Sequence, residues 1–271
     1  DLRNWQKWYP QVKGTDSALI QYSGITTQVN TTLQSGKQLY TVTRVNPEEI
    51  NIKEQTGKKL TYHSVIAISD QLGVHTRVQW VATLDFFSWL NEKMHVRGEI
   101  DNNLRSLKQY IETPLLYYGF PIEMQQITDT LLISKKDTVA PENAFVKLQQ
   151  LFDNLYQYAH SYSIGTGSTK ILGVFPIDAN RVEVIANLPV RHKAPENNGI
   201  IYLEMPQGGK ILTAMYTGPY GNIRKVHKSL QQYIRDKSLR KIALSYEKFF
   251  SDPLPANDSA IVKVQVCYPV F

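Results

Sequence analysis

Cysteine is almost absent from this chain of 271 residues, which contains Cys267 and no other. A single thiol cannot form an intramolecular disulfide, and it excludes metal sites built from several cysteines. Because Cys267 lies in an apolar, strand-like stretch, we expect a small buried side chain there. The six histidines include no pair spaced four residues apart, so the sequence predicts neither a metal site nor a cofactor.

Long apolar runs are also missing, and so is a leader. No stretch of about 18 apolar residues occurs, so the sequence predicts no membrane span. The chain starts at Asp1 without a methionine or a signal-like segment, and its first residues read as the middle of a helix and turn. We therefore expect that a preceding segment was removed. A cytoplasmic location and a membrane anchor in that segment both stay open.

Concentrated charge and several common motifs are missing as well. The formal net charge is +6, but the basic residues form isolated doublets at 135–136, 224–225 and 240–241. No helix-turn-helix or zinc-finger spacing accompanies them, so we expect a solvated surface and no nucleic-acid binding through this chain. Residues 165–170 lack the spacing of a phosphate-binding loop, and no Gly-x-Ser-x-Gly motif indicates a serine hydrolase.

The first part of the chain shows strand patterns followed by one helix. Alternating segments rich in β-branched residues predict an antiparallel meander, with a hairpin turn at residues 70–73; they are residues 39–45, 61–69 and 74–84. The period then changes to that of a helix, whose apolar face is Ile100, Leu104, Leu107 and Ile111. Pro114 ends this helix. We expect one domain over residues 1–114 and a second over residues 120–271.

The second part repeats one order of elements, strand, helix, strand, strand. The first round is residues 125–134, a helix opening at Pro141, then 169–176 and 181–188. The second round is residues 210–217, a helix from about Tyr220, then 245–250 and 261–268. We therefore predict an α+β protein whose second domain is a duplicated β-α-β-β unit. Two such units can pair their sheets and leave a groove at the pseudo-twofold axis.

Ordered motifs in the second round resemble those of GyrI-like effector-binding domains. Gly208-Gly209-Lys210 leads into a strand that ends at Tyr216-Thr217-Gly218-Pro219-Tyr220. Tyr246-Glu247-Lys248-Phe249 follows with an Asp-Pro after it, and the last strand closes with Tyr268-Pro269-Val270. The resemblance implies a central groove that binds apolar or cationic aromatic molecules. It also implies that Glu247, in the Tyr-Glu strand position, supplies the negative charge.

The resemblance places several aromatic side chains near Glu247. Tyr216, Tyr246 and Tyr268 lie on neighbouring strands, and Phe175 faces them from the first round. Tyrosine rings attract cations, and a carboxylate in such a groove needs a cation or hydrogen-bond donors. Strand alternation puts Glu247 and Phe249 on one face and Tyr246 on the other, so we favour Glu247 and Phe249 as ligand contacts. The alternative is a salt-bridged Glu247 with the tyrosines in the core.

The first part resembles the START-like (SRPBCC) polyketide cyclase superfamily. Residues 1–10, with the spacing Asp-x-x-x-Trp-x-x-Trp, and residues 73–80, which end at Trp80, carry this resemblance over about residues 1–112. It implies a helix-grip domain, here without its first strand, around an apolar cavity lined by Trp5, Trp8 and Trp80. The alternative is that the three tryptophans are packing anchors. In close relatives that fuse both domains, the resemblance implies that the part missing here usually includes an apolar N-terminal anchor.

Three functions follow from these features. We favour binding of a small organic molecule without a reaction, as in a ligand sensor that has no DNA-binding segment of its own. The first alternative is a hydrolase of small electrophiles with Glu247 as general base. The second alternative is a protein-interaction module, because some GyrI-like proteins bind a macromolecular partner.

Overall fold

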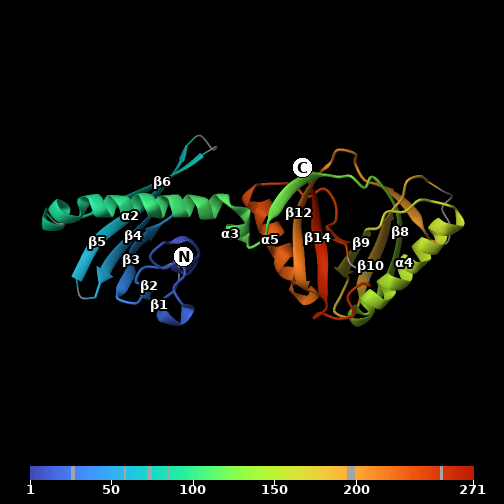
Figure 1. The fold of residues 1–271 in the computed structure, drawn as a ribbon, viewed down its shortest axis with the longest axis horizontal. Helices are drawn as coiled ribbons and strands as arrows, with labels where there is room; N and C mark the ends of the chain where they lie inside the picture. Colours follow the sequence, from blue (N-terminus) through green and yellow to red (C-terminus); the bar gives the residue numbers. More distant parts are fainter. Residues whose placement is uncertain (26–27, 58, 72–74, 85, 194–198, 251–252) are drawn as a thin grey trace. The chain divides into compact units, whose positions relative to one another are not determined.

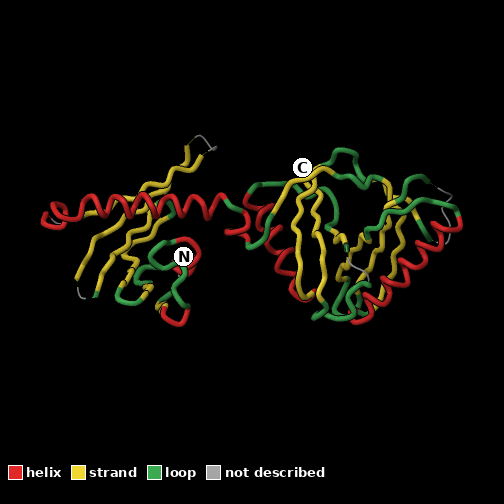
Figure 2. Tube along the Cα trace, in the orientation of Figure 1, coloured by secondary structure: helices red, strands yellow, loops and turns green. Residues whose placement is uncertain are grey.

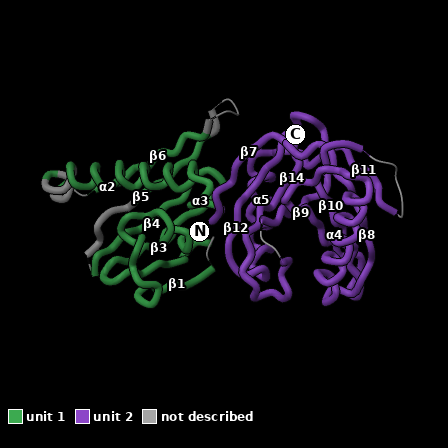
Figure 3. Tube along the Cα trace, turned by 45° about the vertical axis from the view of Figure 1, so that its right-hand side comes forward, with its two compact units in different colours: residues 1–117 green, residues 118–271 purple. Residues whose placement is uncertain are grey.

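The computed structural model describes residues 1–271 except 26–27, 58, 72–74, 85, 194–198 and 251–252 (Figure 1). The chain forms two compact units, Asp1–Tyr117 and Tyr118–Phe271 (Figure 3). Each unit contains one antiparallel sheet, so the protein is of the α+β class. Among the described helices, none is long and apolar enough to cross a membrane.

The sheet of unit 1 has six strands in sequential order, each antiparallel to the next. The strands are β1 (Ile20–Ser23), β2 (Thr32–Ser35), β3 (Gln38–Asn46), β4 (Glu49–Thr56), β5 (Lys59–Gln71) and β6 (His75–Thr83). The predicted meander is therefore present. Strands β5 and β6 pair as in a hairpin, and the tip of the predicted turn lies outside the described residues.

One long helix, α2 (Phe86–Glu112), runs across the strands of unit 1 (Figure 1). It begins well before Ile100, the first apolar position of the predicted helix. The sequence pattern did not indicate its first turns, because their apolar side chains are exposed and follow no core-facing period. These side chains are Phe86, Leu90 and Met94. The helix closes a core that also receives the short helix α1 (Trp5–Trp8), which follows the 3-10 turn η1 (Leu2–Asn4). A further 3-10 turn, η2 (Ser17–Leu19), precedes β1.

The sheet of unit 2 has eight strands in the order β11-β8-β10-β9-β13-β14-β12-β7, all antiparallel. The strands are β7 (Ile122–Gln126), β8 (Leu131–Val139), β9 (Lys170–Pro176), β10 (Val182–Pro189), β11 (Ile201–Glu204), β12 (Lys210–Pro219), β13 (Tyr246–Phe249) and β14 (Ile261–Val270). The order shows that β8, β9 and β10 form one half and β12, β13 and β14 the other, joined where β9 pairs with β13.

Two amphipathic helices of unit 2, α4 (Ala144–Ser161) and α5 (Ile223–Asp236), pack into one apolar core with the sheet (Figure 2). Each starts from a 3-10 turn, η3 (Pro141–Asn143) and η4 (Tyr220–Asn222). The predicted helix positions are buried except Phe145, which is half-buried; the fully covered ones include Leu148, Phe152, Leu155, Val226 and Leu230. A short helix, α3 (Pro114–Tyr118), follows Pro114 instead of an extended connector.

The predicted strand over residues 125–134 is wrong. Residues 122–126 form β7 at one edge of the sheet, whereas β8 starts at Leu131 and pairs with β10 and β11. Single bonds continue the pairing at each end of the segment between them, since Ile127 N–H donates to Gly209 O beside β12, and Met205 N–H donates to Thr130 O beside β11. The apolar alternation continues through this crossing, so pattern alone cannot locate it. The short edge strand β11 was not predicted either.

Candidate functional site

A groove of about 630 Å³ opens in unit 2 between the start of α4, the side of α5 and the sheet. This volume lies within the range of small-molecule sites. Aromatic and apolar side chains form much of the wall, including Ala144, Phe145, Val174, Val182, Tyr220, Ile223 and Tyr268. Polar groups converge on the same space, namely Glu247, His227, Gln231, Ser245, Arg224, Lys228 and Asp258.

Glu247 is the buried charge of this groove, with 7% of its surface exposed. It lies on β13 between β9 and β14, opposite Leu172 and Val266. The strand alternates, so Glu247 and Phe249 are buried on the helix-covered face while Tyr246 faces the other way. A carboxylate therefore occupies a core-facing strand position of the kind that apolar side chains usually fill. Burying this carboxylate costs free energy unless it is hydrogen-bonded.

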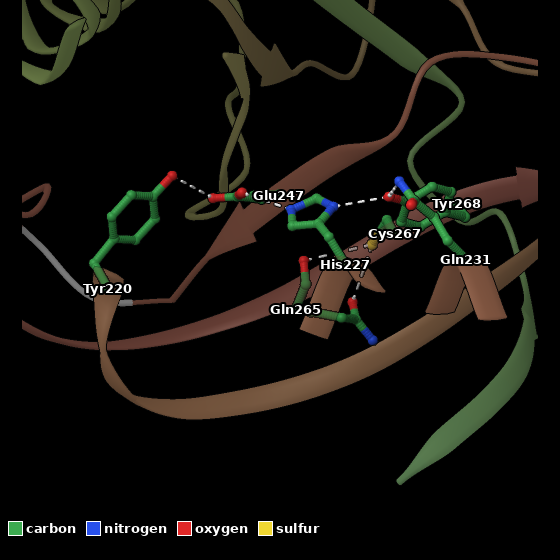
Figure 4. A network of polar contacts seen from close by, with 7 residues as sticks. All are labelled: Tyr220, His227, Gln231, Glu247, Gln265, Cys267 and Tyr268. Atoms are coloured by element: carbon green, nitrogen blue, oxygen red, sulfur yellow. Dashed lines mark hydrogen bonds and ion pairs between the residues drawn. The ribbon is translucent and has the colours of Figure 1, made fainter. Parts of the chain in front are cut away.

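Tyr220 and His227 hold the two carboxylate oxygens of Glu247 (Figure 4). The Tyr220 hydroxyl donates to Oε2 at 3.2 Å, and His227 Nε2 lies 2.9 Å from Oε1. On the other side of the imidazole ring, Nδ1 lies 2.9 Å from the Tyr268 hydroxyl. Gln231 Nε2 donates to that hydroxyl at 3.1 Å. Four side chains around the carboxylate thus form one continuous hydrogen-bonded chain.

Gln231 Nε2 is a donor only, so the Tyr268 hydroxyl accepts a hydrogen bond from it. The carboxylate of Glu247 is an acceptor only, so His227 Nε2–H donates to it. The donor and acceptor between His227 Nδ1 and the Tyr268 hydroxyl depend on the form of the imidazole. Two residues of α5 and one of the last strand thus hold Glu247 through one network.

Tyr220 joins the polar chain to the aromatic wall. Its ring meets Phe145 edge to face at 4.8 Å between centroids, and lies 6.1 Å from Phe249. Burial, with the Glu247 charge as the second cause, raises the pKa of the Tyr220 phenol. The phenol therefore remains a neutral donor to Glu247 at ordinary pH.

The rim of the groove carries charges of both signs. Arg224 and Lys228 project from the first turns of α5, and Asp258 lies on the loop before β14. All three residues are exposed, so water screens their charges more than that of Glu247. The inner end of the groove is thus acidic and aromatic, while the outer end is mixed.

The structure brings some of the predicted residues to the groove and leaves others out. Glu247 and Tyr268 line it. Phe175 lines it too, although its ring folds back over Gly173 on its own strand. Phe249 is 1% exposed and packs in the core behind Tyr220. Tyr216 lies elsewhere on β12.

The two tyrosines outside the groove have local reasons for their positions. The Tyr216 hydroxyl donates to Pro219 O at 2.8 Å, so its side chain lies against its own turn. Tyr246 packs with a small cluster on the far face of the sheet, formed by Ile127, Ile211 and Cys267. Burial raises the pKa of the Cys267 thiol to about 12, which fits the small buried side chain predicted for it.

Tyr220, His227 and Gln231 are site residues that sequence reasoning missed. Spacing signals two of them, because His227 and Gln231 are four residues apart on α5, lie on one flank of its apolar stripe and face the same space. Within the described residues, no group of three or more His, Cys, Asp or Glu side chains is arranged to hold a metal ion.

In unit 1, the three predicted tryptophans form an aromatic core. Trp5 and Trp8 are 5.7 Å apart between centroids, and Trp80 lies 6.3 Å from Trp5 and 6.5 Å from Trp8. All three are buried. Tyr9 stacks on Trp80 at 5.9 Å with an angle of 10° between the rings. Their mutual packing is the arrangement expected of packing anchors, although Trp80 also borders a shallow hollow beside α2.

Comparison with known proteins identifies structural neighbours only. No family model matches the sequence, and no curated protein matches it. Among solved structures, the EcmrR C-terminal domain is similar at 16% identity and a TM-score of 0.47, covering 56% of this chain and 98% of that one. A hydrolase from Listeria innocua is similar at 15% identity and a TM-score of 0.41, covering 55% and 91%. SAV2435 bound to tetraphenylphosphonium is similar at 12% identity and a TM-score of 0.29, covering 55% and 93%.

Proposed function

We propose that the groove beside Glu247 binds a small organic molecule with an aromatic or apolar body and a positive charge. The observation that carries this proposal is the buried carboxylate of Glu247 in an aromatic-walled groove of about 630 Å³. Within the described residues, its partners are the Tyr220 hydroxyl and the His227 imidazole, and no lysine or arginine forms an ion pair with it. A bound cation would pair with this carboxylate.

The walls of the groove suit the rest of such a molecule. Phe145, Tyr220 and Tyr268 offer ring faces and edges, which attract a cation and cover an aromatic body. Both oxygens of Glu247 already accept one hydrogen bond each. The groove therefore favours a ligand whose charge is spread over an apolar body above one that needs several hydrogen bonds.

The fold proposals rest on the order of elements. In unit 2, β8-α4-β9-β10 and β12-α5-β13-β14 repeat one plan, which supports a duplicated GyrI-like effector-binding domain over residues 120–271. In unit 1, a six-stranded meander with one long helix supports a START-like domain of the helix-grip type over residues 1–114. On this proposal the protein is a ligand sensor whose output passes through another segment or partner.

Titration with tetraphenylphosphonium tests the binding proposal, because this cation is aromatic, permanently charged and without hydrogen-bond donors. Calorimetry should show binding to the full chain and at least about tenfold weaker binding to Glu247→Gln, since one charge is removed. Glu123→Gln, which removes an exposed carboxylate on β7, serves as the matched control and should leave the affinity unchanged. Equal binding of neutral triphenylphosphine oxide, or an unaffected Glu247→Gln, would contradict the proposal.

The pairing of Glu247 with His227 favours one second function, hydrolysis of a small electrophile. A carboxylate and an imidazole in contact can act as a base and an acid in one step. Incubation with styrene oxide should then yield the diol faster than the buffer does, and Glu247→Gln should abolish the excess. Equal rates with and without the protein would remove this alternative and leave the binding proposal intact.

A further inference from the structure

His227 is a titratable side chain in direct contact with the buried carboxylate of the groove in unit 2. Its Nε2 atom lies 2.9 Å from Glu247 Oε1, which is within ion-pair distance when the ring is protonated. The side chain is 23% exposed and lines the groove, so the ring can exchange protons with water. Histidine is the residue type whose charge ordinarily changes between about pH 5 and pH 8.

Both forms of the imidazole fit the same contacts (Figure 4). In the neutral form, Nε2–H donates to Glu247 and Nδ1 accepts from the Tyr268 hydroxyl. In the protonated form, Nε2–H still donates to Glu247, and Nδ1–H donates to the Tyr268 oxygen, which also accepts from Gln231. Protonation therefore keeps the contact with Glu247 and changes the charge beside it.

The other ionisable groups around this ring lie on a few elements. Among the described residues, those lining the groove with His227 are Glu247 on β13, Tyr268 on β14, Tyr220 on η4, Asp258 on the loop before β14, and Arg224 and Lys228 on α5. The side chains that α4, β9 and β10 contribute to this lining are uncharged. Burial raises the pKa of the Tyr220 phenol, so the phenol stays neutral where an imidazole titrates. Water screens the exposed Arg224, Lys228 and Asp258, which leaves Glu247 as the charge in contact with the ring.

A protonated His227 and a bound cation would compete for the same carboxylate. The imidazolium would pair with Glu247 from 2.9 Å and would repel a second positive charge in the groove. A ligand cation would therefore bind more tightly when the imidazole is neutral. By thermodynamic linkage, the bound cation would in turn disfavour protonation of His227 by the same factor.

We propose that His227 makes cation binding pH-dependent, so that the groove holds an organic cation at neutral and alkaline pH and releases it in acid. This inference rests on the proposed function of the groove, because it requires a cationic ligand beside Glu247. When the protonated form binds such a ligand, the Nδ1 proton leaves to the solvent. Nε2–H then remains on Glu247, and the Tyr268 hydroxyl donates to Nδ1.

Tetraphenylphosphonium is the probe, since its charge does not change with pH. Calorimetric titration of the full chain between about pH 8.5 and pH 5.5 should show an affinity that falls as the pH falls, by up to about tenfold per pH unit because one proton is linked. His227→Gln keeps an N–H donor but takes up no proton, so its affinity should not change with pH. His160→Gln, an exposed histidine on α4, serves as the matched control and should keep the original pH profile.

A second measurement uses the unaltered chain and does not depend on the folding of His227→Gln. At acidic pH, adding tetraphenylphosphonium should move the ring ¹⁵N signals of His227 from the protonated to the neutral pattern. A pH dependence that persists in His227→Gln, or ring signals that do not move on binding, would overturn the inference. Binding that is independent of pH would also overturn it and leave the proposed function standing, whereas no binding at any pH would overturn both.

Discussion

Among the described residues, each unit buries one glutamate at an inward-facing strand position, but the surroundings of the two differ. Glu54 accepts from two hydroxyl groups in a cavity of about 300 Å³, whereas Glu247 accepts from a tyrosine and a histidine in a groove of about 630 Å³. The histidine links Glu247 to a longer chain of side chains, so the same residue type stands in two different hydrogen-bonded surroundings.

The largest expected effect tests whether the ring of Phe249 belongs to the core of unit 2 or to the wall of the groove. Phe249→Ala should lower the free energy of unfolding by about 3–5 kcal/mol, because a fully buried ring is removed from the core of unit 2. Urea unfolding measures the loss. Tyr216→Phe is the control, since it removes one hydroxyl from a half-buried side chain and should change stability by about 1 kcal/mol or less. A small effect of Phe249→Ala would mean that the ring faces the groove.

Removing one donor from each glutamate sharpens the comparison between them. His227→Phe should cost about 1–3 kcal/mol, because Glu247 Oε1 and the Tyr268 hydroxyl both lose a partner. Ser64→Ala should cost about 1–2 kcal/mol in unit 1, where one bond to Glu54 is lost. Chemical denaturation followed by circular dichroism gives both values. A larger cost for Ser64→Ala would reverse the expected order.

Alkaline pH should act on stability through Tyr220. Because the pKa of its phenol is raised above 10.0 in the folded protein, the unfolded chain binds fewer protons at high pH. The contribution is present below about pH 10 and is lost as the pH rises toward the folded-state value. Urea unfolding between about pH 8 and pH 11 should show this decline, and Tyr220→Phe should reduce it. An identical decline in Tyr220→Phe would assign the loss to other groups.

The smallest expected effect concerns an ion pair on the surface of unit 2. Lys136 Nζ lies 2.8 Å from Glu183 Oε1, with 66% and 30% of the two side chains exposed. Glu183→Gln should change the free energy of unfolding by less than about 1 kcal/mol, because water and salt screen such pairs. Thermal unfolding at low and high salt measures it. A large effect would show that exposed charges matter here as much as the buried glutamates.

Alternation along strands was the sequence signal that predicted most about the groove. It placed Glu247 and Phe249 on one face and Tyr246 on the other, as the structure has them. It could not separate Phe249 in the core from a ligand contact, because both lie on the same face. It also could not predict that the Tyr216 hydroxyl donates to Pro219 O, since that bond depends on the path of the backbone at the end of β12.

Polar residues within apolar patterns were harder to predict. His227 flanks the apolar stripe of α5, and its partner on β13 is 20 residues away in the sequence, so helix spacing alone cannot join them. Glu54 stands in a strand that reads as alternating, and only the register with Tyr40 shows that it faces inward. In both cases the pairing between distant segments decides which charge is buried.

The strand that carries Glu247 is also the junction between the halves of the eight-stranded sheet. Strand β13 has four residues, and three register pairs with β9 join the two halves there, at Glu247, Lys248 and Phe249. A molecule held by Glu247 and by side chains of both helices would bridge that junction. Ligand binding would then be thermodynamically linked to the pairing of β9 with β13, because a bound ligand stabilises the paired state. A bound ligand would therefore slow hydrogen exchange of the β9 and β13 amides.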